Sequence, residues 1–209
     1  MKRELVWLFD LDNTLHDASH AIFPAINRNM NALIARVLES EARPSHPDAV
    51  NAVRIAYWQR YGATLLGMMR HHSVRSEDFL RDAHQFDDLS AMIRAERGIA
   101  RMLRRLPGRK ILLTNAPSSY AHHVLRHLGL HRHFSGHLPI ESMVVHRQLR
   151  PKPSRLLLRK LLERRGCLAD LSQLESLCHT VAASSLCGLG QSAPKPVLST
   201  LRHFRGDYL

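Results

Sequence analysis

Two carboxylates stand two residues apart directly after an apolar run. Leu5 to Phe9 is continuously apolar, and Asp10 and Asp12 follow it, ahead of residues 13–15, which read Asn-Thr-Leu. Such a run is typical of a buried parallel strand, and ligands bind beyond the carboxyl ends of the strands in an open α/β sheet. One carboxylate can attack phosphorus while the other manages the proton of the leaving and entering oxygens. The pattern therefore predicts a reactive site at the end of the first strand.

Polar residues also stand at the borders of two further patterns, one apolar and one helical. Thr114 and Asn115 come directly after the apolar run that ends at Leu113, and Lys152 lies between two prolines just before a leucine-rich stretch. The Thr114 hydroxyl and the Asn115 amide can donate hydrogen bonds to a phosphoryl oxygen. Lys152 supplies positive charge where negative charge develops on a phosphoryl group. A Thr-Asn or a Lys-Pro pair alone is common in turns and indicates little. These pairs become informative because they occur in a fixed order along the chain, each at the border of a predicted element.

Taken together, the three motifs resemble those of the haloacid dehalogenase superfamily. Residues 10–15 look like its first motif, residues 112–115 like its second and residues 150–154 like its third. The likeness covers roughly residues 4 to 165. It implies a magnesium-dependent hydrolase with a Rossmann-like core.

The resemblance also implies a role for each matching residue. Asp10 would be the nucleophile that forms an aspartyl-phosphate, and also a magnesium ligand. Asp12 would be the general acid/base, and its backbone carbonyl would bind magnesium as well. Thr114 and Lys152 would bind and neutralise the phosphoryl group. An acid at position 12 favours a phosphatase, because the dehalogenases lack an acid there.

The region between the first and second strands narrows the expected substrate. Residues 55–68, and residues 16–19 before the first helix, are similar to the cap region of pyrimidine 5′-nucleotidases. Tyr57, Trp58 and Tyr61 could offer a flat face to a base. The alternative is that this aromatic stripe is simply cap core. The substrate class therefore depends on the family likeness and not on these rings.

Periodicity predicts the elements that must position these residues. Helical spacing is expected over residues 18–39, 48–71, 99–106, 121–128 and 154–165, with shorter helical pieces up to 93 and a second strand at 110–115. This order indicates an α/β fold, a Rossmann-like open parallel sheet with an inserted helical cap. The expected organisation is a core of residues 1–16 and 96–166, a cap of residues 17–95 and an atypical tail of residues 167–209.

The tail differs from the rest of the chain. It holds all three cysteines, Cys167, Cys178 and Cys187, but only three of the 30 basic residues, and neither helical nor strand periodicity is sustained. The resemblance leads us to expect a fourth motif, a strand ending in acids that complete the magnesium shell. The tail has only isolated acids, and the last strands of the sheet have no clear counterpart. A frameshift near residue 166 and a divergent, inactive family member both account for this.

Composition limits the other classes of function. The 209 residues carry a net charge of +12 and 15 histidines, yet the basic residues are scattered and form no dense block. Nucleic acid is therefore an unlikely partner, and the charge favours small phosphorylated anions. His123 and His127 have the spacing of a zinc pair, but a solvated helix face explains them better. The cysteines indicate neither a disulfide framework nor a zinc site. No apolar run of about 18 residues or signal peptide is evident, so a cytoplasmic protein without a membrane partner is expected.

The sequence thus predicts a magnesium-dependent phosphomonoesterase that dephosphorylates pyrimidine nucleoside 5′-monophosphates, with activity impaired by the missing motif. One alternative is a phosphatase for a sugar phosphate or phosphoglycolate. The other is a non-catalytic phosphate-binding protein of the same fold. In each case the partner is a small phosphate ester, and the chain is a monomer or homodimer.

Overall fold

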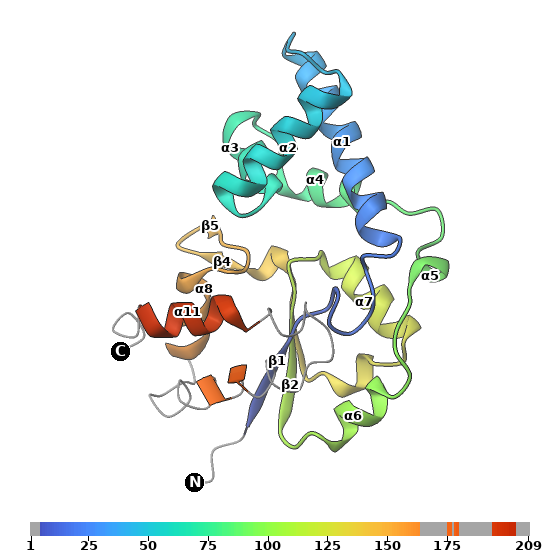
Figure 1. The fold of residues 1–209 in the computed structure, drawn as a ribbon, viewed down its shortest axis with the longest axis vertical. Helices are drawn as coiled ribbons and strands as arrows, with labels where there is room; N and C mark the ends of the chain where they lie inside the picture. The colour runs from blue at the N-terminus through green and yellow to red at the C-terminus, as the bar shows by residue number, and fades with distance from the viewer. Residues whose placement is uncertain (1–4, 164–174, 177, 180–193, 204–209) are drawn as a thin grey trace. The chain divides into compact units, whose positions relative to one another are not determined.

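The chain divides into two compact units. A computed structural model describes residues 5–163, 175–176, 178–179 and 194–203. The first unit is Met1–Pro153 and the second is Ser154–Leu209, so the division falls before the tail expected from residue 167. The first unit holds the sheet, the cap and every predicted site residue. The second holds α8 (Arg155–Glu163) and α11 (Lys195–His203) (Figure 1).

A parallel sheet forms the centre of the first unit. Its strands are β1 (Val6–Phe9), β2 (Arg109–Leu113) and β3 (Gly136–Leu138), in the order β1-β2-β3. Because β1 and β2 run parallel, with Phe9 beside Leu112, the residues that follow both strands meet at one edge. The expected α/β fold with a parallel sheet is confirmed.

The first strand is not buried as its sequence predicts. Leu5, Val6 and Leu8 are 40%, 40% and 49% exposed, and exposure alternates along β1. Within the described residues β1 is the edge strand of the sheet, paired on one side only, with β2. An apolar edge of this kind invites pairing with other chains.

The helices of the core cover one face of the sheet. They are α6 (Ile99–Arg105) and α7 (Ser118–His127), followed by the 3-10 turns η1 (His131–His133) and η2 (Ile140–Ser142). The buried cluster beneath them includes Leu11, Leu15, Leu103, Leu112, Val124 and Leu125. Tyr120 belongs to this cluster and is 3% exposed, so the first turn of α7 points an aromatic side chain inward.

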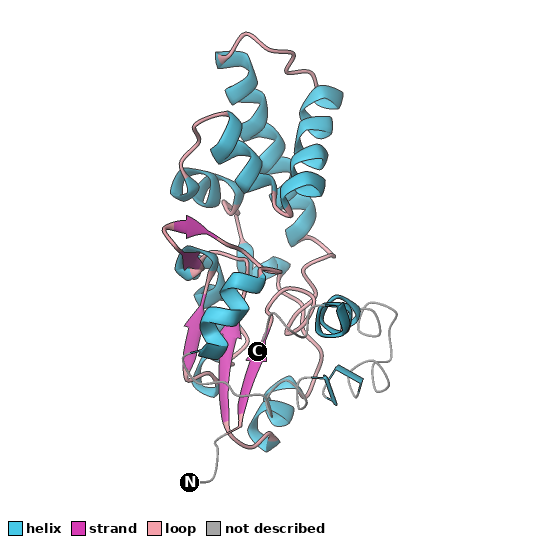
Figure 2. Cartoon of the chain, turned by 90° about the vertical axis from the view of Figure 1, so that its left-hand side faces the viewer, coloured by secondary structure: helices cyan, strands magenta, loops and turns pink. Residues whose placement is uncertain are grey.

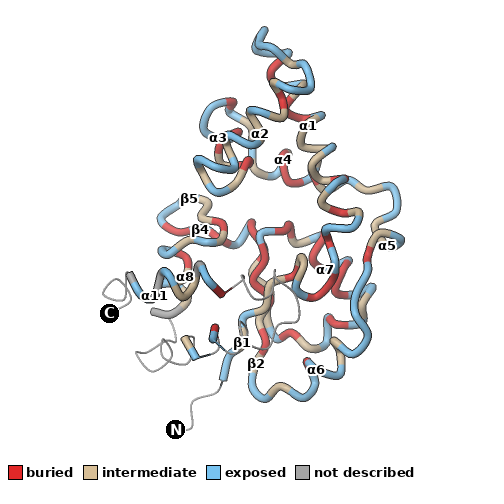
Figure 3. Tube along the Cα trace, viewed as in Figure 1, coloured by how far each residue is buried: buried red, intermediate tan, exposed pale blue. Residues whose placement is uncertain are grey.

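Helices alone make up the cap (Figure 2). They are α1 (Ile22–Ser40), α2 (Pro47–Tyr61), α3 (Thr64–His71) and α4 (Ser76–Ala83), and the short α5 (Leu89–Met92) lies on the way back to the core. A second buried cluster lies mainly among the cap helices and includes Leu33, Ile34, Leu38, Leu65, Met68 and Phe79, together with Ile140 of η2. Figure 3 shows buried segments along these helices in red. The single helix expected over residues 48–71 is two helices, because Gly62 adopts a left-handed φ of 78° and ends α2.

Elements at three places in the chain were not expected from the sequence. One is β3, and another is the antiparallel pair of β4 (Val144–Val145) and β5 (Gln148–Leu149), joined by two residues with positive φ. The third is α11, which contradicts the expectation that no helical period is sustained in the tail. Most of the tail, including Cys167, Cys187, Asp170 and Asp207, lies outside the described residues. None of the described helices has the length and apolar character needed to cross a membrane.

Candidate active site

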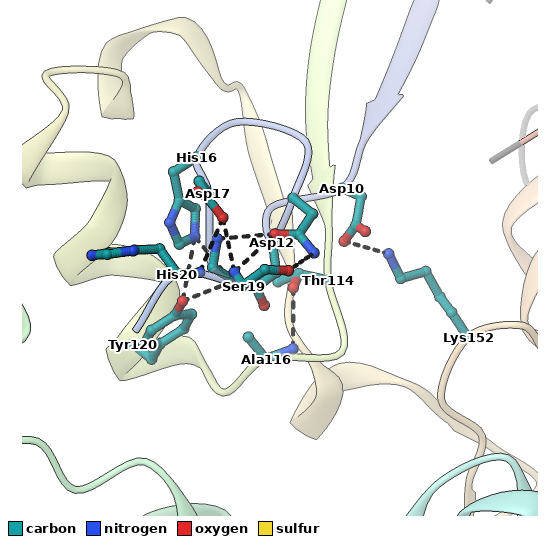
Figure 4. A network of polar contacts seen from close by, with 12 residues as sticks. Asp10, Asp12, His16, Asp17, Ser19, His20, Thr114, Ala116, Tyr120 and Lys152 are labelled. Carbon is teal, nitrogen blue, oxygen red and sulfur yellow. Dashed lines mark hydrogen bonds and ion pairs between the residues drawn. The ribbon is translucent and has the colours of Figure 1, made fainter. Parts of the chain in front are cut away.

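The loop after β1 is held in a tight turn. Asn13 has a left-handed φ of 56°, a conformation that asparagine tolerates better than most residues. Its side-chain oxygen accepts hydrogen bonds from the backbone N–H groups of Ala18 and Ser19 at 3.0 and 3.1 Å. The backbone N–H of Leu15 closes the turn on the Leu11 carbonyl at 2.8 Å. The turn presents Asp10 and Asp12 at the carboxyl end of the sheet (Figure 4).

Asp10 and Lys152 face each other although 142 positions separate them. Lys152 Nζ donates to Asp10 Oδ1 at 2.6 Å and to the Leu113 carbonyl at 2.6 Å. The Asp10 side chain is 45% exposed and that of Lys152 is 23% exposed. The expected nucleophile and the expected cation are therefore brought together at an accessible position.

Asn115 holds the backbone of Lys152. Its Oδ1 accepts from the Lys152 N–H at 2.8 Å, and its Nδ2 donates to the Lys152 carbonyl at 2.9 Å. This reciprocal pair fixes the lysine against the end of β2. The geometry gives Asn115 a positioning role, while its expected contact with phosphate stays a prediction.

Thr114 is 1% exposed and terminates β2. Its Oγ1 accepts from the Ala116 N–H at 3.1 Å, and its own N–H donates to the Leu138 carbonyl at 3.1 Å. The hydroxyl proton remains for donation to an anion. The two contacts orient the hydroxyl at the same strand edge as Asp10.

Asp12 has two buried partners. Tyr120 Oη donates to Asp12 Oδ1 at 2.7 Å, and His16 Nε2 lies 2.9 Å from the same oxygen. Burial, and then the negative charge of Asp12, raise the pKa of Tyr120 far above its ordinary value, so its hydroxyl stays protonated. Sequence reasoning missed both partners. His16 four residues after Asp12 was a usable signal, whereas Tyr120 lies just before the helix expected over residues 121–128 and no pattern marked it.

The cap aromatics that were expected to face a base are largely engaged within the cap. Tyr57 Oη contacts His72 Nε2 at 2.7 Å, and Tyr61 Oη contacts His71 Nε2 at 2.6 Å. Trp58 is 61% exposed. The structure thus pairs two of these rings with histidines and leaves the third on the surface.

A cavity of about 350 Å³ lies between the segment that returns from the cap and the start of α7. Tyr120 forms part of its wall, which connects the cavity to Asp12. The rest of the wall is aromatic, acidic and imidazole in character, and includes His84, Phe86, Asp87, Asp88 and His123. It can take a flat group that donates hydrogen bonds.

Metal ligands are few at this site. Within the described ranges, no three histidine, cysteine, aspartate or glutamate side chains gather in a way that could hold a metal ion. His123, suspected as part of a zinc pair, instead contacts Ser90 Oγ at 2.9 Å. Asp10 and Asp12 remain the acids at the strand edge. Magnesium in proteins is often held by one or two carboxylates together with substrate phosphate and water, and the residues present fit that arrangement.

A family model that matches most of the chain assigns the family. The family model described as haloacid dehalogenase-like hydrolase matches residues 6–169. The chain belongs to this family. A haloacid dehalogenase-superfamily hydrolase from Geobacter sulfurreducens is 23% identical, with 77% of this chain and 72% of that chain covered and a TM-score of 0.37. A predicted phosphatase from Clostridium acetobutylicum is 16% identical, with 81% and 74% covered and a TM-score of 0.43. Because both sequence identities are below 25% and both TM-scores are below 0.5, the family assignment rests on the family model and not on these two structures.

The end of the chain matches a second family model. The iron-sulfur binding region of NADH-ubiquinone oxidoreductase-F matches residues 154–209 and overlaps the hydrolase match only in residues 154–169. NADP-reducing hydrogenase subunit HndC of Solidesulfovibrio fructosivorans is 40% identical over 52 residues, which are 25% of this chain and 11% of that protein. An NADH-quinone oxidoreductase subunit of Mycobacterium tuberculosis is 38% identical over 45 residues, 22% and 10%. The chain therefore spans about a tenth of the length of these relatives.

The cysteines of this hydrolase do not fit an iron-sulfur cluster. Such clusters are held by four cysteine thiolates, and the whole chain has three cysteines with no Cys-x-x-Cys spacing. Cys178 is 6% exposed, and burial raises the pKa of its thiol, which disfavours the thiolate that a metal needs. The likeness to an iron-sulfur binding region is thus one of sequence and not of the ligand set.

Proposed function

We propose that this hydrolase is a phosphomonoesterase that acts on pyrimidine nucleoside 5′-monophosphates through an aspartyl-phosphate on Asp10. The observation that carries the proposal is the approach of Lys152 Nζ to Asp10 Oδ1 at 2.6 Å, with Asp12 two residues further along the same turn. A carboxylate, a cation and a second acid at one strand edge are the groups that phosphoryl transfer requires.

Each residue has a defined task in the proposed reaction. Asp10 attacks phosphorus, so an Oδ–P bond forms while the bond from phosphorus to the leaving oxygen breaks. Asp12 gives a proton to that oxygen and then takes one from the water that hydrolyses the aspartyl-phosphate. Lys152 and the Thr114 hydroxyl stabilise the charge on the phosphoryl oxygens.

Magnesium is part of the proposal. The Asp10 carboxylate and the backbone carbonyl of Asp12 would hold it, together with water and substrate phosphate. When bound, the ion neutralises the charge of the phosphoryl group. Because the described residues offer no third acid, we expect weak binding in the absence of substrate.

The substrate class is supported by the likeness of residues 55–68 to pyrimidine nucleotidase caps. We propose that the nucleoside lies toward the cavity beside Tyr120, where Asp87 and Asp88 can accept hydrogen bonds from base or sugar. Trp58 remains the exposed candidate for a base contact from the cap. A cytoplasmic location stays a prediction.

A second candidate function is phosphate binding without turnover. The shortage of acids beside Asp10 in the part of the chain that the structure describes favours it, because an aspartyl-phosphate forms and breaks readily only when its charge is neutralised.

Substrate turnover decides between these functions. The full chain is assayed with magnesium against uridine, cytidine, adenosine and guanosine monophosphates and phosphoglycolate, with Asp10→Asn as the control. We expect higher kcat/KM for the two pyrimidine nucleotides and no activity in Asp10→Asn. Equal kcat/KM for all bases would reject the substrate class, activity in Asp10→Asn would reject the nucleophile, and phosphate binding without turnover would favour the second function.

A further inference from the structure

We propose that Tyr120 and His16 are positioning residues that hold Asp12 so that only one of its oxygens faces the leaving group. This inference rests on the proposed function, because it assigns Asp12 the proton-transfer role. Neither residue belongs to the turn from Asp10 to Leu15. His16 stands where the chain enters the cap, and Tyr120 lies in the first turn of α7.

The contacts converge on a single atom. Tyr120 Oη and His16 Nε2 lie 2.7 and 2.9 Å from Asp12 Oδ1, and they lie 3.3 Å from each other. The Asp12 side chain is 17% exposed and the His16 side chain is not exposed. Since Oδ1 receives two donors, any proton that Asp12 carries sits on Oδ2, the oxygen left to address a substrate.

The geometry also fixes the tautomer of His16. The Asp12 carboxylate only accepts hydrogen bonds, and the Tyr120 hydroxyl donates its hydrogen bond to Asp12. The hydrogen between His16 Nε2 and Asp12 must therefore be on Nε2. His16 Nδ1 is then a bare acceptor, and this buried atom has no hydrogen-bond partner among the described residues. A buried acceptor without a hydrogen-bond donor is unfavourable for folding. The position of the His16 ring therefore favours the contact with Asp12 over a hydrogen bond for its own Nδ1.

The two donors are anchored by different parts of the first unit. Asp12 and His16 form an isolated β-bridge, and the next residue, Asp17, donates its N–H to the Arg94 carbonyl at 2.7 Å. Tyr120 is fixed by packing against Phe86 and His84, with ring centroids 5.9 and 5.4 Å away. Asp12 is therefore held from the cap entry on one side and from the cavity wall on the other.

Positioning of a general acid has a signature that a structural role lacks. An alkyl leaving group such as a nucleoside 5′-oxygen needs a proton as it departs, whereas p-nitrophenolate departs without one. Loss of the contacts to Asp12 must therefore slow the nucleotide far more than the aryl phosphate. A general loosening of the fold slows both alike.

The test compares kcat/KM for uridine monophosphate, glycerol phosphate and p-nitrophenyl phosphate, since kcat/KM reports the step in which the leaving group departs. Glycerol phosphate has an alkyl leaving group but no nucleoside to contact the cavity wall, so its loss should follow that of the nucleotide, and a loss on the nucleotide alone would indicate a nucleoside contact instead. Tyr120→Phe keeps the buried ring and removes only the hydroxyl, and we expect a loss of roughly 10- to 100-fold on the nucleotide but under about 3-fold on the aryl phosphate. His16→Leu should behave likewise, and His16→Gln, which restores an N–H, should recover most of the loss. Thr64→Val, which removes a buried hydroxyl that donates to the Arg54 carbonyl in the cap, is the matched control and should leave all these values unchanged.

Equal losses on the nucleotide and the aryl phosphate would overturn the proposal. If the parent chain turns over none of these substrates, the proposed function fails, and nitrogen NMR of the imidazole rings then decides the positioning question by itself. A proton on His16 Nε2, with a resonance that moves in Tyr120→Phe, supports the contacts. A neutral ring that carries its proton on Nδ1 alone rules them out, because Nε2 then has no hydrogen to donate.

Discussion

At the scale of single residues, the lysine of the site depends on an asparagine for its place. Asn115 holds both sides of the Lys152 backbone, so Asn115→Ala removes two hydrogen bonds without touching Asp10. We expect kcat/KM to fall about 10- to 100-fold, because small misplacements of a charge-stabilising group are costly. Inhibition by inorganic phosphate should weaken in parallel. Asn115→Asp keeps the acceptor and loses the donor, so an effect as large as that of alanine would show that only the donor matters.

A second residue-scale prediction concerns the cap and pH. The hydrogen bond from His72 lowers the pKa of Glu41, and Arg43, 3.6 Å away, adds to the effect. A carboxyl whose pKa is lowered by folding stabilises the fold above its ordinary value, here 4.5, and loses this effect as the pH falls through the lowered pKa. Glu41→Gln should therefore lower Tm at neutral pH, and the difference from the parent should vanish in acid. A constant difference between pH 3 and 7 would contradict this.

At the scale of elements, α2 and α3 approach so closely that α3 needs a glycine, Gly67, where it packs against Tyr57 of α2. A Cβ on Gly67 would stand 2.2 Å from Tyr57 Cγ. We expect Gly67→Ala to lower the free energy of unfolding by about 1–3 kcal/mol, as overpacking does. Denaturant unfolding measures it, with the exposed Met69→Ala in the same helix as a control of small effect. An unchanged midpoint for Gly67→Ala would mean that the Tyr57 ring moves aside freely.

The elements show what periodicity can and cannot reveal. The helices of the cap and the two strands that carry Asp10 and Thr114 follow from apolar spacing, since they are long or strongly apolar. The break at Gly62 was missed because helical spacing continues across it. The pair β4 and β5 has two residues in each strand, joined by His146 and Arg147 at positive φ rather than by glycine or asparagine, so no turn signal marks it.

The candidate site, too, could be predicted from the sequence only in part. Asp10, Asp12, Thr114 and Lys152 could be named as candidates from residue type and position, and the structure brings Lys152 to Asp10, while the catalytic role of each stays a prediction. The contacts of Asp12 were not, since Tyr120 is joined to it across 108 positions by tertiary packing. The expected base contact on α2 stays a prediction that comes from the family likeness, and the cavity beside Tyr120 was not expected because its lining residues show no aromatic periodicity.

At the scale of the whole molecule, the two family matches bear on the origin of the tail. A segment translated out of frame has no reason to resemble another family. The 40% identity over 52 residues to the HndC subunit of an NADP-reducing hydrogenase, together with the second family match, therefore favours a segment that comes from another protein family over a frameshift. That match covers residues 154–209, the region in which the fourth motif of the hydrolase was expected.

The tail gives a prediction about metal content. With three cysteines in the chain, anaerobic purification and reconstitution with iron and sulfide should yield no stable four-iron cluster. Iron and acid-labile sulfide, measured after desalting, should be near zero, and absorbance near 410 nm should be absent. Stoichiometric iron and sulfide would show that a non-cysteine ligand or a second chain completes the set.

The clamp between Asn115 and Lys152 has a mechanical consequence. Lys152 is the penultimate residue of the first unit, so tension on the chain from residue 154 onward reaches it after two peptide links. That tension would act on the contacts that hold Lys152, which are the two hydrogen bonds with Asn115 and those of its Nζ with Asp10 and the Leu113 carbonyl. A pull on the chain beyond Pro153 thus acts on the residue whose ammonium group contacts Asp10.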